Sequence, residues 1–251
     1  IYLLGNNSTL DGEYNHRLFY FNSSEDTTTV IDGFTIRYGA TDNDEGLNPG
    51  KGGAVYIENS YPKFTNCTFE YNRAYNEGDA IAIKNGGNAL FEDCVFRYQD
   101  YDWNGNEHGG AAWIYNSSAT FNRCDFYNNG YNYGNYYGSA LYIYSTSYGG
   151  DDKVFINNCN FTDNGRNNGR EGGAIWLRAA ELHIDNSQFY RNNASSHGGA
   201  IYISDNSYNN IYINNTIFEE NGQSVNNRGG AIVKWETNSN GNYLDYPDTL
   251  F

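Results

Sequence analysis

The segment from Asp100 to Glu107 carries a pattern of side chains suited to a metal ion. It reads DYDWNGNE, so oxygen-bearing side chains stand at the alternate positions Asp100, Asp102 and Asn104 before a glycine. The first half of an EF-hand loop has this pattern, because alternate oxygens and a glycine turn can wrap Ca²⁺. The closing glutamate is missing, since the twelfth position is Ala111. We expect a solvated loop and no required cofactor, with Ca²⁺ at these three residues as the alternative.

Groups suited to acid–base or nucleophilic catalysis are scattered along the chain. His108 and His197 each precede a Gly-Gly pair without an obvious acidic partner, and the doublet Asp151-Asp152 lies in an expected loop. Glycoside hydrolysis needs a pair of carboxyl groups, and elimination needs a positioned base. No Ser-His-Asp set, phosphate-binding glycine loop or zinc-type spacing is present. The sequence therefore favours a protein that is not an enzyme.

Aromatic residues recur at one position of a repeated motif. They are Tyr56, Trp113, Tyr142, Trp176 and Tyr202, with Ala82 and Val233 at the equivalent places. On stacked strands about 4.8 Å apart, these side chains would form a ladder on the outward face of one sheet. Such a ladder could bind the apolar face of a polysaccharide, contact a protein neighbour in an assembly, or stabilise the sheet by stacking. We treat it as the candidate ligand or assembly surface and keep all three interpretations.

The four cysteines also share one position of the repeat. Cys67, Cys94, Cys124 and Cys159 fall in one register, which Ser187 and Thr216 continue. Neighbouring strands bring the Cα atoms within disulfide range, but parallel Cβ vectors leave the Cβ atoms slightly too far apart for relaxed bridges. We predict a buried ladder of free thiols, with disulfides as the alternative. Zinc is not expected, because no histidine shares this register.

All of these alignments follow from two units that alternate along most of the chain. The first is the GGAI-type unit, found at Gly52–Ile57, Gly78–Ile83, Gly109–Ile114, Gly138–Ile143, Gly172–Leu177, Gly198–Ile203 and Gly229–Lys234. The second is F-x-x-N or a close variant, which places Phe69, Phe96, Phe126, Phe161, Phe189 and Phe218 in one register. Equivalent alanines are 26 to 34 residues apart. A period near 30 that tolerates insertions is typical of a solenoid.

Within a repeat, apolar residues recur at every second position, which is the periodicity of strands. The alternation breaks once, at the residue before the Cys, Ser or Thr, namely at Asn66, Asp93, Arg123, Asn158, Asn186 and Asn215. Asparagine tolerates the left-handed conformation that a one-residue corner needs, and the paired glycines suit a turn with positive φ. We therefore predict an all-β fold: a right-handed parallel β-helix of about eight to nine turns, each with three short strands.

The units GGAIYI at 198–203, FYRN at 189–192 and FEEN at 218–221 resemble the repeats of polymorphic outer-membrane proteins. Their wider relatives are right-handed β-helix repeat proteins of bacterial and archaeal surfaces. The resemblance covers about residues 28–234. It implies the fold and a place at the cell surface, but not an activity, because pectate-lyase-like enzymes share the architecture.

The chain is expected to form one elongated domain, since no linker interrupts the repeat. Residues 1–27 should form irregular first turns, residues 28–234 the regular repeats, and residues 235–251 a C-terminal tail or cap. Lys234 falls in an inward position, where the last repeat breaks down. Both ends are expected to meet a cap, another domain or another subunit, because open strand edges invite pairing.

The 251 residues carry a net charge of −15, which argues against nucleic acid as a partner. No apolar run approaches the length of a membrane-spanning helix. The chain opens at Ile1 without methionine, so we expect an excised or mature piece of an exported protein. N-glycosylation sequons occur at Asn6, Asn7, Asn22, Asn66, Asn116, Asn160, Asn193 and Asn214, several of them by chance in so Asn-rich a chain.

These features together favour a non-enzymatic extracellular or cell-surface protein, either structural or adhesive. Self-association end-to-end or laterally, into a filament or sheath, or contact with other surface proteins, is the expected mode of action. The main alternative is a polysaccharide lyase or glycoside hydrolase acting along the first-sheet face. A monomeric glycan-binding module is the second alternative.

Overall fold

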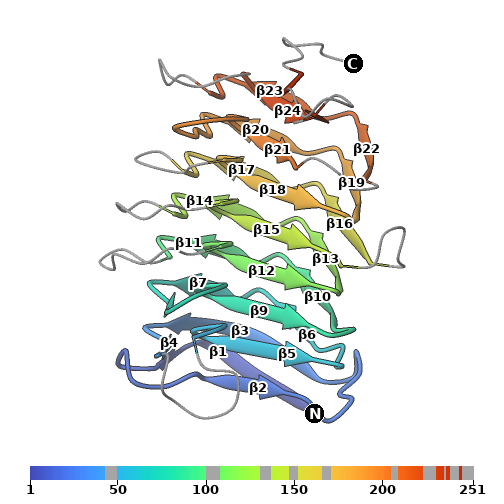
Figure 1. Ribbon diagram of the computed structural model, residues 1–251. Coiled ribbons are helices and arrows are strands. Elements are labelled where there is room, and N and C mark those ends of the chain that lie inside the picture. The colour runs from blue at the N-terminus through green and yellow to red at the C-terminus, as the bar shows by residue number, and fades with distance from the viewer. Residues whose placement is uncertain are drawn as a thin grey trace.

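The computed structural model describes residues 1–42, 50–99, 108–130, 137–146, 152–165, 171–204, 209–222, 230–234, 236–237 and 243–244. Within these ranges the regular secondary structure consists of strands. They are stacked from the N-terminal to the C-terminal end into an elongated solenoid (Figure 1). No helix among the described residues is long and apolar enough to cross a membrane.

Three parallel faces run along the solenoid. The first consists of β2 (Phe19–Phe21), β5 (Val55–Glu58), β9 (Ile81–Lys84), β12 (Ala112–Tyr115), β15 (Leu141–Tyr144), β18 (Ile175–Arg178), β21 (Ile201–Ile203) and β24 (Ile232–Lys234). The second consists of β6 (Lys63–Thr65), β10 (Asn88–Glu92), β13 (Ser118–Asn122), β16 (Lys153–Asn157), β19 (Glu181–Asp185) and β22 (Asn210–Asn214). The third consists of β7 (Thr68–Glu70), β11 (Val95–Arg97), β14 (Asp125–Tyr127), β17 (Asn160–Thr162), β20 (Gln188–Tyr190) and β23 (Ile217–Glu219).

Two longer strands begin the second and third faces together. They are β1 (Tyr2–Asp11) and β3 (Val30–Arg37), and β3 pairs with β6 through one half and with β7 through the other. The pair β4 (Ala40–Thr41) and β8 (Arg73–Ala74) is parallel. The pair β25 (Glu236–Thr237) and β26 (Tyr243–Leu244) is antiparallel. Three strands per turn in parallel register is the arrangement that the repeat predicted.

The interior consists of columns of identical or similar side chains. Phe69, Phe96, Phe126, Phe161 and Phe189 are fully buried, and neighbouring rings of this column stack with centroids 4.4 to 4.8 Å apart. Stacked aromatic pairs contribute beyond the apolar area that they bury. From β5 and β6 onward, the residues of the first two faces that point into the solenoid are buried as well, except on the last turn, where Ile211, Ile213 and Ile232 are partly buried.

The corners adopt the left-handed conformation that the sequence predicted. Asn66, Asp93, Arg123, Asn158, Asn186 and Asn215 have φ between 45° and 55°. The first glycine of the first six GGAI-type units also has positive φ. At Gly52 a Cβ atom would lie 2.2 Å from the carbonyl oxygen of Val55. A further left-handed corner follows the third face at Tyr71, Tyr98, Asn128, Asp163, Arg191 and Glu220, which the sequence did not predict because these residue types differ.

The number of turns is about seven, slightly fewer than the eight to nine predicted. The prediction counted partial repeats at both ends. At the N-terminal end, β1 and β2 supply a turn whose register with β3 shifts between Leu4 and Ser8. At the other end, Lys234 pairs in register with Ile203 as expected but is exposed, because no further described turn covers it.

Candidate functional surfaces

The aromatic ladder of the first face is buried. Tyr56, Trp113, Tyr142, Trp176 and Tyr202 are between 0% and 9% exposed, and together with Ala82 and Val233 they form a second apolar cluster outside the solenoid core. Their side chains point away from the core, as predicted, but other side chains cover them. These five residues, the candidate ligand or assembly surface of the sequence analysis, therefore present little surface to a ligand.

The flat faces of the rings are occupied as well. Tyr142 stacks on Trp176 with centroids 4.4 Å apart and on His108 with centroids 4.7 Å apart. Tyr56 stacks on Tyr20, and the guanidinium of Arg17 lies 5.2 Å from its ring centre. A sugar ring packs against an aromatic face, so it would have to displace these neighbours. The geometry agrees with the third sequence interpretation, in which stacking stabilises the sheet.

A strip of polar residues lies beside the ladder, one on each successive turn. It consists of Lys51, Glu77, His108, Tyr137, Glu171 and His197, joined by isolated parallel bridges. Glu171 accepts a hydrogen bond from the indole nitrogen of Trp176 at 3.3 Å. Tyr137 meets the edge of the same indole ring. The two histidines that the sequence marked as catalytic candidates thus belong to a strip that packs against the aromatic ladder.

The ladder has one gap, at Ala82, and Lys51 lies beside it. The ammonium group of Lys51 forms an ion pair with Glu77 and lies 4.5 Å from the ring centre of Trp113. Burial, and to a smaller extent the charge of Lys84, lowers the pKa of Lys51 to about 8. The carboxylate of Glu77 opposes this shift because it stabilises the charged amine. The arrangement fills the space that the small side chain leaves.

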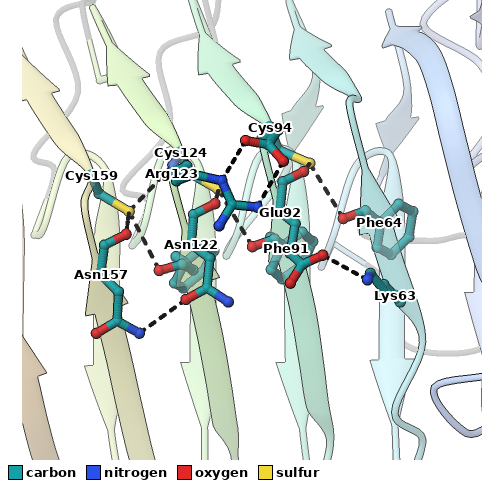
Figure 2. Close-up of polar contacts among 12 residues, drawn as sticks. Lys63, Phe64, Phe91, Glu92, Cys94, Asn122, Arg123, Cys124, Asn157 and Cys159 are labelled. Atoms are coloured by element: carbon teal, nitrogen blue, oxygen red, sulfur yellow. Dashed lines mark hydrogen bonds and ion pairs between the residues drawn. The ribbon is translucent and has the colours of Figure 1, made fainter.

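The four cysteines form the buried ladder of free thiols that the sequence predicted. Figure 2 shows three of them, Cys94, Cys124 and Cys159, on neighbouring turns. Each thiol lies 3.2 to 3.4 Å from the carbonyl oxygen two residues earlier, and Ser187 and Thr216 donate to the equivalent oxygens at 2.9 and 2.8 Å. The position therefore needs a small side chain that can donate a hydrogen bond to the carbonyl oxygen on the other side of the corner.

The same side chains accept hydrogen bonds from the preceding turn. The amide of Cys124 donates to the sulfur of Cys159, the amide of Cys159 to the hydroxyl of Ser187, and the amide of Ser187 to Thr216. Burial raises the pKa of Cys94 and Cys124. The pKa of Cys159 is raised by its contact with Cys124 and by burial. These three are neutral thiols at physiological pH and poor nucleophiles.

The asparagine of F-x-x-N forms a second buried ladder, whose role the sequence did not reveal. The side-chain amide of Asn164 donates hydrogen bonds to the carbonyl oxygen of Phe126 and to the side-chain oxygen of Asn192, both at 2.9 Å. Its own oxygen accepts from the backbone and side chain of Asn129. Asn72, Gln99 and Asn221 make equivalent bonds to carbonyl oxygens of the preceding turn. The motif therefore satisfies the backbone at a corner.

Several basic residues on the outside pair with acidic residues of a neighbouring turn. Lys63 pairs with Glu92, Arg123 with Asp93, and Arg97 with Glu70, at 2.6 to 2.7 Å (Figure 2 shows the first two cations). His183 lies 2.6 Å from Glu181, which also pairs with Lys153. Among the described residues no group of three or more His, Cys, Asp or Glu is placed to hold a metal ion.

Several sequence candidates fall outside the described residues. Asp100, Asp102 and Asn104 do so, and the Ca²⁺ prediction stays untested. Asp151 does too, whereas its neighbour Asp152 accepts a hydrogen bond from the hydroxyl of Ser145 at 2.7 Å.

A family model described as "Right handed beta helix region" matches residues 18–244. The chain belongs to the right-handed β-helix family. The match confirms the hand that the sequence predicted and spans every turn from β2 onward. It supports a β-helix repeat protein but does not confirm the narrower resemblance to polymorphic outer-membrane proteins. A search of curated proteins and of solved structures returned no match.

Proposed function

We propose that this β-helix is an extracellular or cell-surface protein with a structural or adhesive role and no enzymatic activity. The observation that carries the proposal is the burial of the outward side chains of the first face. β-Helix enzymes that cleave polysaccharides act along this face, where carboxyl groups or bases must reach the substrate. Here the equivalent positions hold stacked aromatic rings beneath a polar strip.

The ordered interior supports the same proposal. Columns of phenylalanine, thiol and asparagine side chains run from turn to turn, and such continuous columns suit a long stiff scaffold. The repeat units that resemble polymorphic outer-membrane proteins support a place at the cell surface. A rod of this kind works through repeated contacts, either with copies of itself in a filament or sheath or with other surface proteins.

The test is a cleavage assay together with a view of the assembled protein. The purified chain is incubated with acidic and neutral polysaccharides, with and without Ca²⁺, and new reducing ends and unsaturated products are measured. We expect none, and electron microscopy of the same material at neutral pH is expected to show ordered fibres or sheets. Turnover of any polysaccharide that depends on the protein would replace this proposal with the lyase or hydrolase alternative. Antibody labelling of intact source cells checks the surface location.

A further inference from the structure

A row of tyrosine rings lies on the outside of the rod, at the left-handed corner that follows the third face. Tyr38, Tyr71 and Tyr98 occupy equivalent places on three successive turns, with φ between 52° and 54°. Neighbouring rings stack with centroids 5.7 and 5.5 Å apart. Tyr127, the last residue of β14, follows on the next turn, with its ring centre 5.2 Å from that of Tyr98. All four side chains are partly exposed.

The contact between Tyr98 and Tyr127 differs from the others in the row. The two ring planes are inclined by 69°, whereas those of Tyr71 and Tyr98 are inclined by 10°. The hydroxyl of Tyr98 donates a hydrogen bond to the hydroxyl of Tyr127 at 2.8 Å, which is a usual length between two oxygens. This bond, and to a smaller extent burial, raises the pKa of Tyr98. The two rings therefore meet at the edges that carry their hydroxyl groups.

Such an arrangement favours oxidative coupling of the two phenols. A bond between the carbons next to the hydroxyls lies in the plane of both rings, so the rings must approach edge to edge. In the product the two hydroxyls flank the new bond, and here they already lie side by side. Face-to-face rings such as Tyr71 and Tyr98 would first have to turn. A pair that the fold holds close to the reactive geometry couples faster than two rings that meet by diffusion.

We propose that Tyr98 and Tyr127 are a cross-linking site, at which a peroxide-driven one-electron oxidant joins the two rings as dityrosine. The inference rests on the proposed structural function for its purpose and adds a covalent modification to it. The four cysteines of the interior are free thiols, so the tyrosine link supplies a covalent connection between turns that disulfides do not.

The reaction balances with one peroxide for each link. Each phenol loses one electron and the proton of its hydroxyl, which leaves the unpaired electron shared between the oxygen and the carbons beside it. One such carbon of each ring joins the other, and the hydrogens on these two carbons move to the oxygens as both rings become aromatic again. The two electrons and two protons reduce hydrogen peroxide, whose O–O bond breaks, to two molecules of water.

The link fastens two neighbouring turns from the outside. Tyr98 follows β11 and Tyr127 ends β14, and the two residues are 29 positions apart in the chain. Closing a loop of this kind restricts the unfolded chain, as a disulfide does. We therefore expect the linked protein to unfold at a higher temperature than the unlinked protein.

The test is photo-oxidation of the purified chain with a ruthenium tris-bipyridyl complex and persulfate, a small oxidant that also acts by breaking an O–O bond. The protein is kept dilute so that separate chains seldom meet, and thermal melts establish that each variant is folded. We expect the blue fluorescence of dityrosine and a loss of two hydrogens in the mass of the monomer. Digestion is expected to give one linked pair of peptides, containing Tyr98 and Tyr127.

Three variants and one internal comparison serve as controls. Tyr127→Phe and Tyr98→Phe keep an aromatic ring but remove one phenol, and each is expected to lose the link. Tyr71→Phe leaves the pair intact and is expected to keep the link. The internal comparison is Tyr115 with Tyr144, whose rings are inclined by 67° with centroids 5.4 Å apart. Within the described part of the chain, the hydroxyls of that pair share no hydrogen bond.

A link formed in Tyr127→Phe with the yield of the parent would overturn the inference. So would a link that joins Tyr115 to Tyr144 in preference to the proposed pair, because ring proximity alone would then decide the product. Dityrosine found only between separate chains would overturn it as well. The polysaccharide assay judges the structural function separately, so the failure of either proposal is recognised by its own measurement.

Discussion

At the scale of the residue, the cysteine position shows how one side chain can serve two turns. A thiol or hydroxyl there donates a hydrogen bond to the carbonyl oxygen across the corner and accepts one from a backbone amide of the preceding turn. Cysteine, serine and threonine share this ability, which explains why Ser187 and Thr216 can continue the row of four cysteines. The row of thiols is therefore an element of the scaffold, and it requires no redox or metal chemistry.

Replacing Cys159 separates hydrogen bonding from packing. Cys159→Ala leaves the buried amide of Cys124 and the carbonyl of Asn157 without their side-chain partner, and we expect a loss of about 1–3 kcal/mol in the free energy of unfolding. Cys159→Ser keeps a donor and an acceptor and is expected to lose clearly less. Denaturant unfolding of both variants measures the difference. Equal losses would mean that volume, and not hydrogen bonding, selects the residue.

The buried asparagines predict a larger effect. Asn164→Ala removes hydrogen bonds to Phe126, Asn129 and Asn192 at once, and we expect the free energy of unfolding to fall by about 3 kcal/mol. The matched control is Asn160→Ala, which removes one exposed bond to Asp125 and should cost less than about 1 kcal/mol. Similar values for the two variants would contradict a special role for the buried ladder.

At the scale of the element, each strand of the first face is apolar on both sides. Its inward residues fill the solenoid and its outward aromatic residues fill the cluster under the polar strip. Parallel strands covered on both faces normally have this composition. In the described part of the chain, the strands of this face are therefore buried on both sides.

Trp176 provides a test of this layer. It is 6% exposed and stacks on Tyr142, so Trp176→Ala is expected to lower the free energy of unfolding by about 3–5 kcal/mol. Tyr212→Ala, at an outward site on the second face, is expected to change it by less than about 1 kcal/mol. Unfolding curves in urea give both numbers. A Trp176→Ala protein as stable as the parent would mean that the ring is there for a ligand.

Pairs between neighbouring turns make the rod sensitive to acid. The hydrogen bond and charge of Arg123 hold the pKa of Asp93 below its ordinary value. A carboxyl group whose pKa is lower in the folded than in the unfolded state stabilises the fold above the unfolded pKa, and this contribution is lost as pH falls through the folded pKa. The thermal midpoint is thus expected to drop below about pH 4.

Asp93→Asn should flatten part of that acid dependence while changing little at pH 7, because the pair is largely exposed. The melting temperatures of the variant and the parent are compared from about pH 2.5 to 7, a range that covers carboxyl titration, in low and in high salt. An unchanged acid profile in the variant would assign the loss to other carboxyl groups, with Asp32 the next to test.

At the scale of the whole molecule, the interior is a single stack of columns, so the thiols become reactive only when the stack opens. We expect the native protein to react slowly with a thiol reagent and the denatured protein to titrate four thiols without reductant. Fewer than four would establish disulfide bridges. Rapid reaction of the native protein would show that the columns open locally, as terminal repeats of a solenoid can.

Much of this architecture can be predicted from sequence because a solenoid repeats one local pattern. Period-2 alternation identified the strands, the interruption at Asn66 and its equivalents identified a corner, and the shared register of the cysteines identified a buried ladder. Each of these signals lies within a few residues, and recurrence along the chain strengthens it. The fold, its hand and the three strands per turn followed from them.

The state of the aromatic ladder could be decided only by the tertiary structure. Alternation shows that Tyr56 and its equivalents point away from the core, but not what lies above them. The strip that covers them contributes one residue per turn, from Lys51 to His197, so it has no alternation and no common residue type to reveal it. The left-handed corner at Tyr71 and Glu220 was hidden for the same reason. The sequence by itself determined which residues stack, because stacking follows the local period, whereas the contacts between separate columns depend on how each turn closes in space.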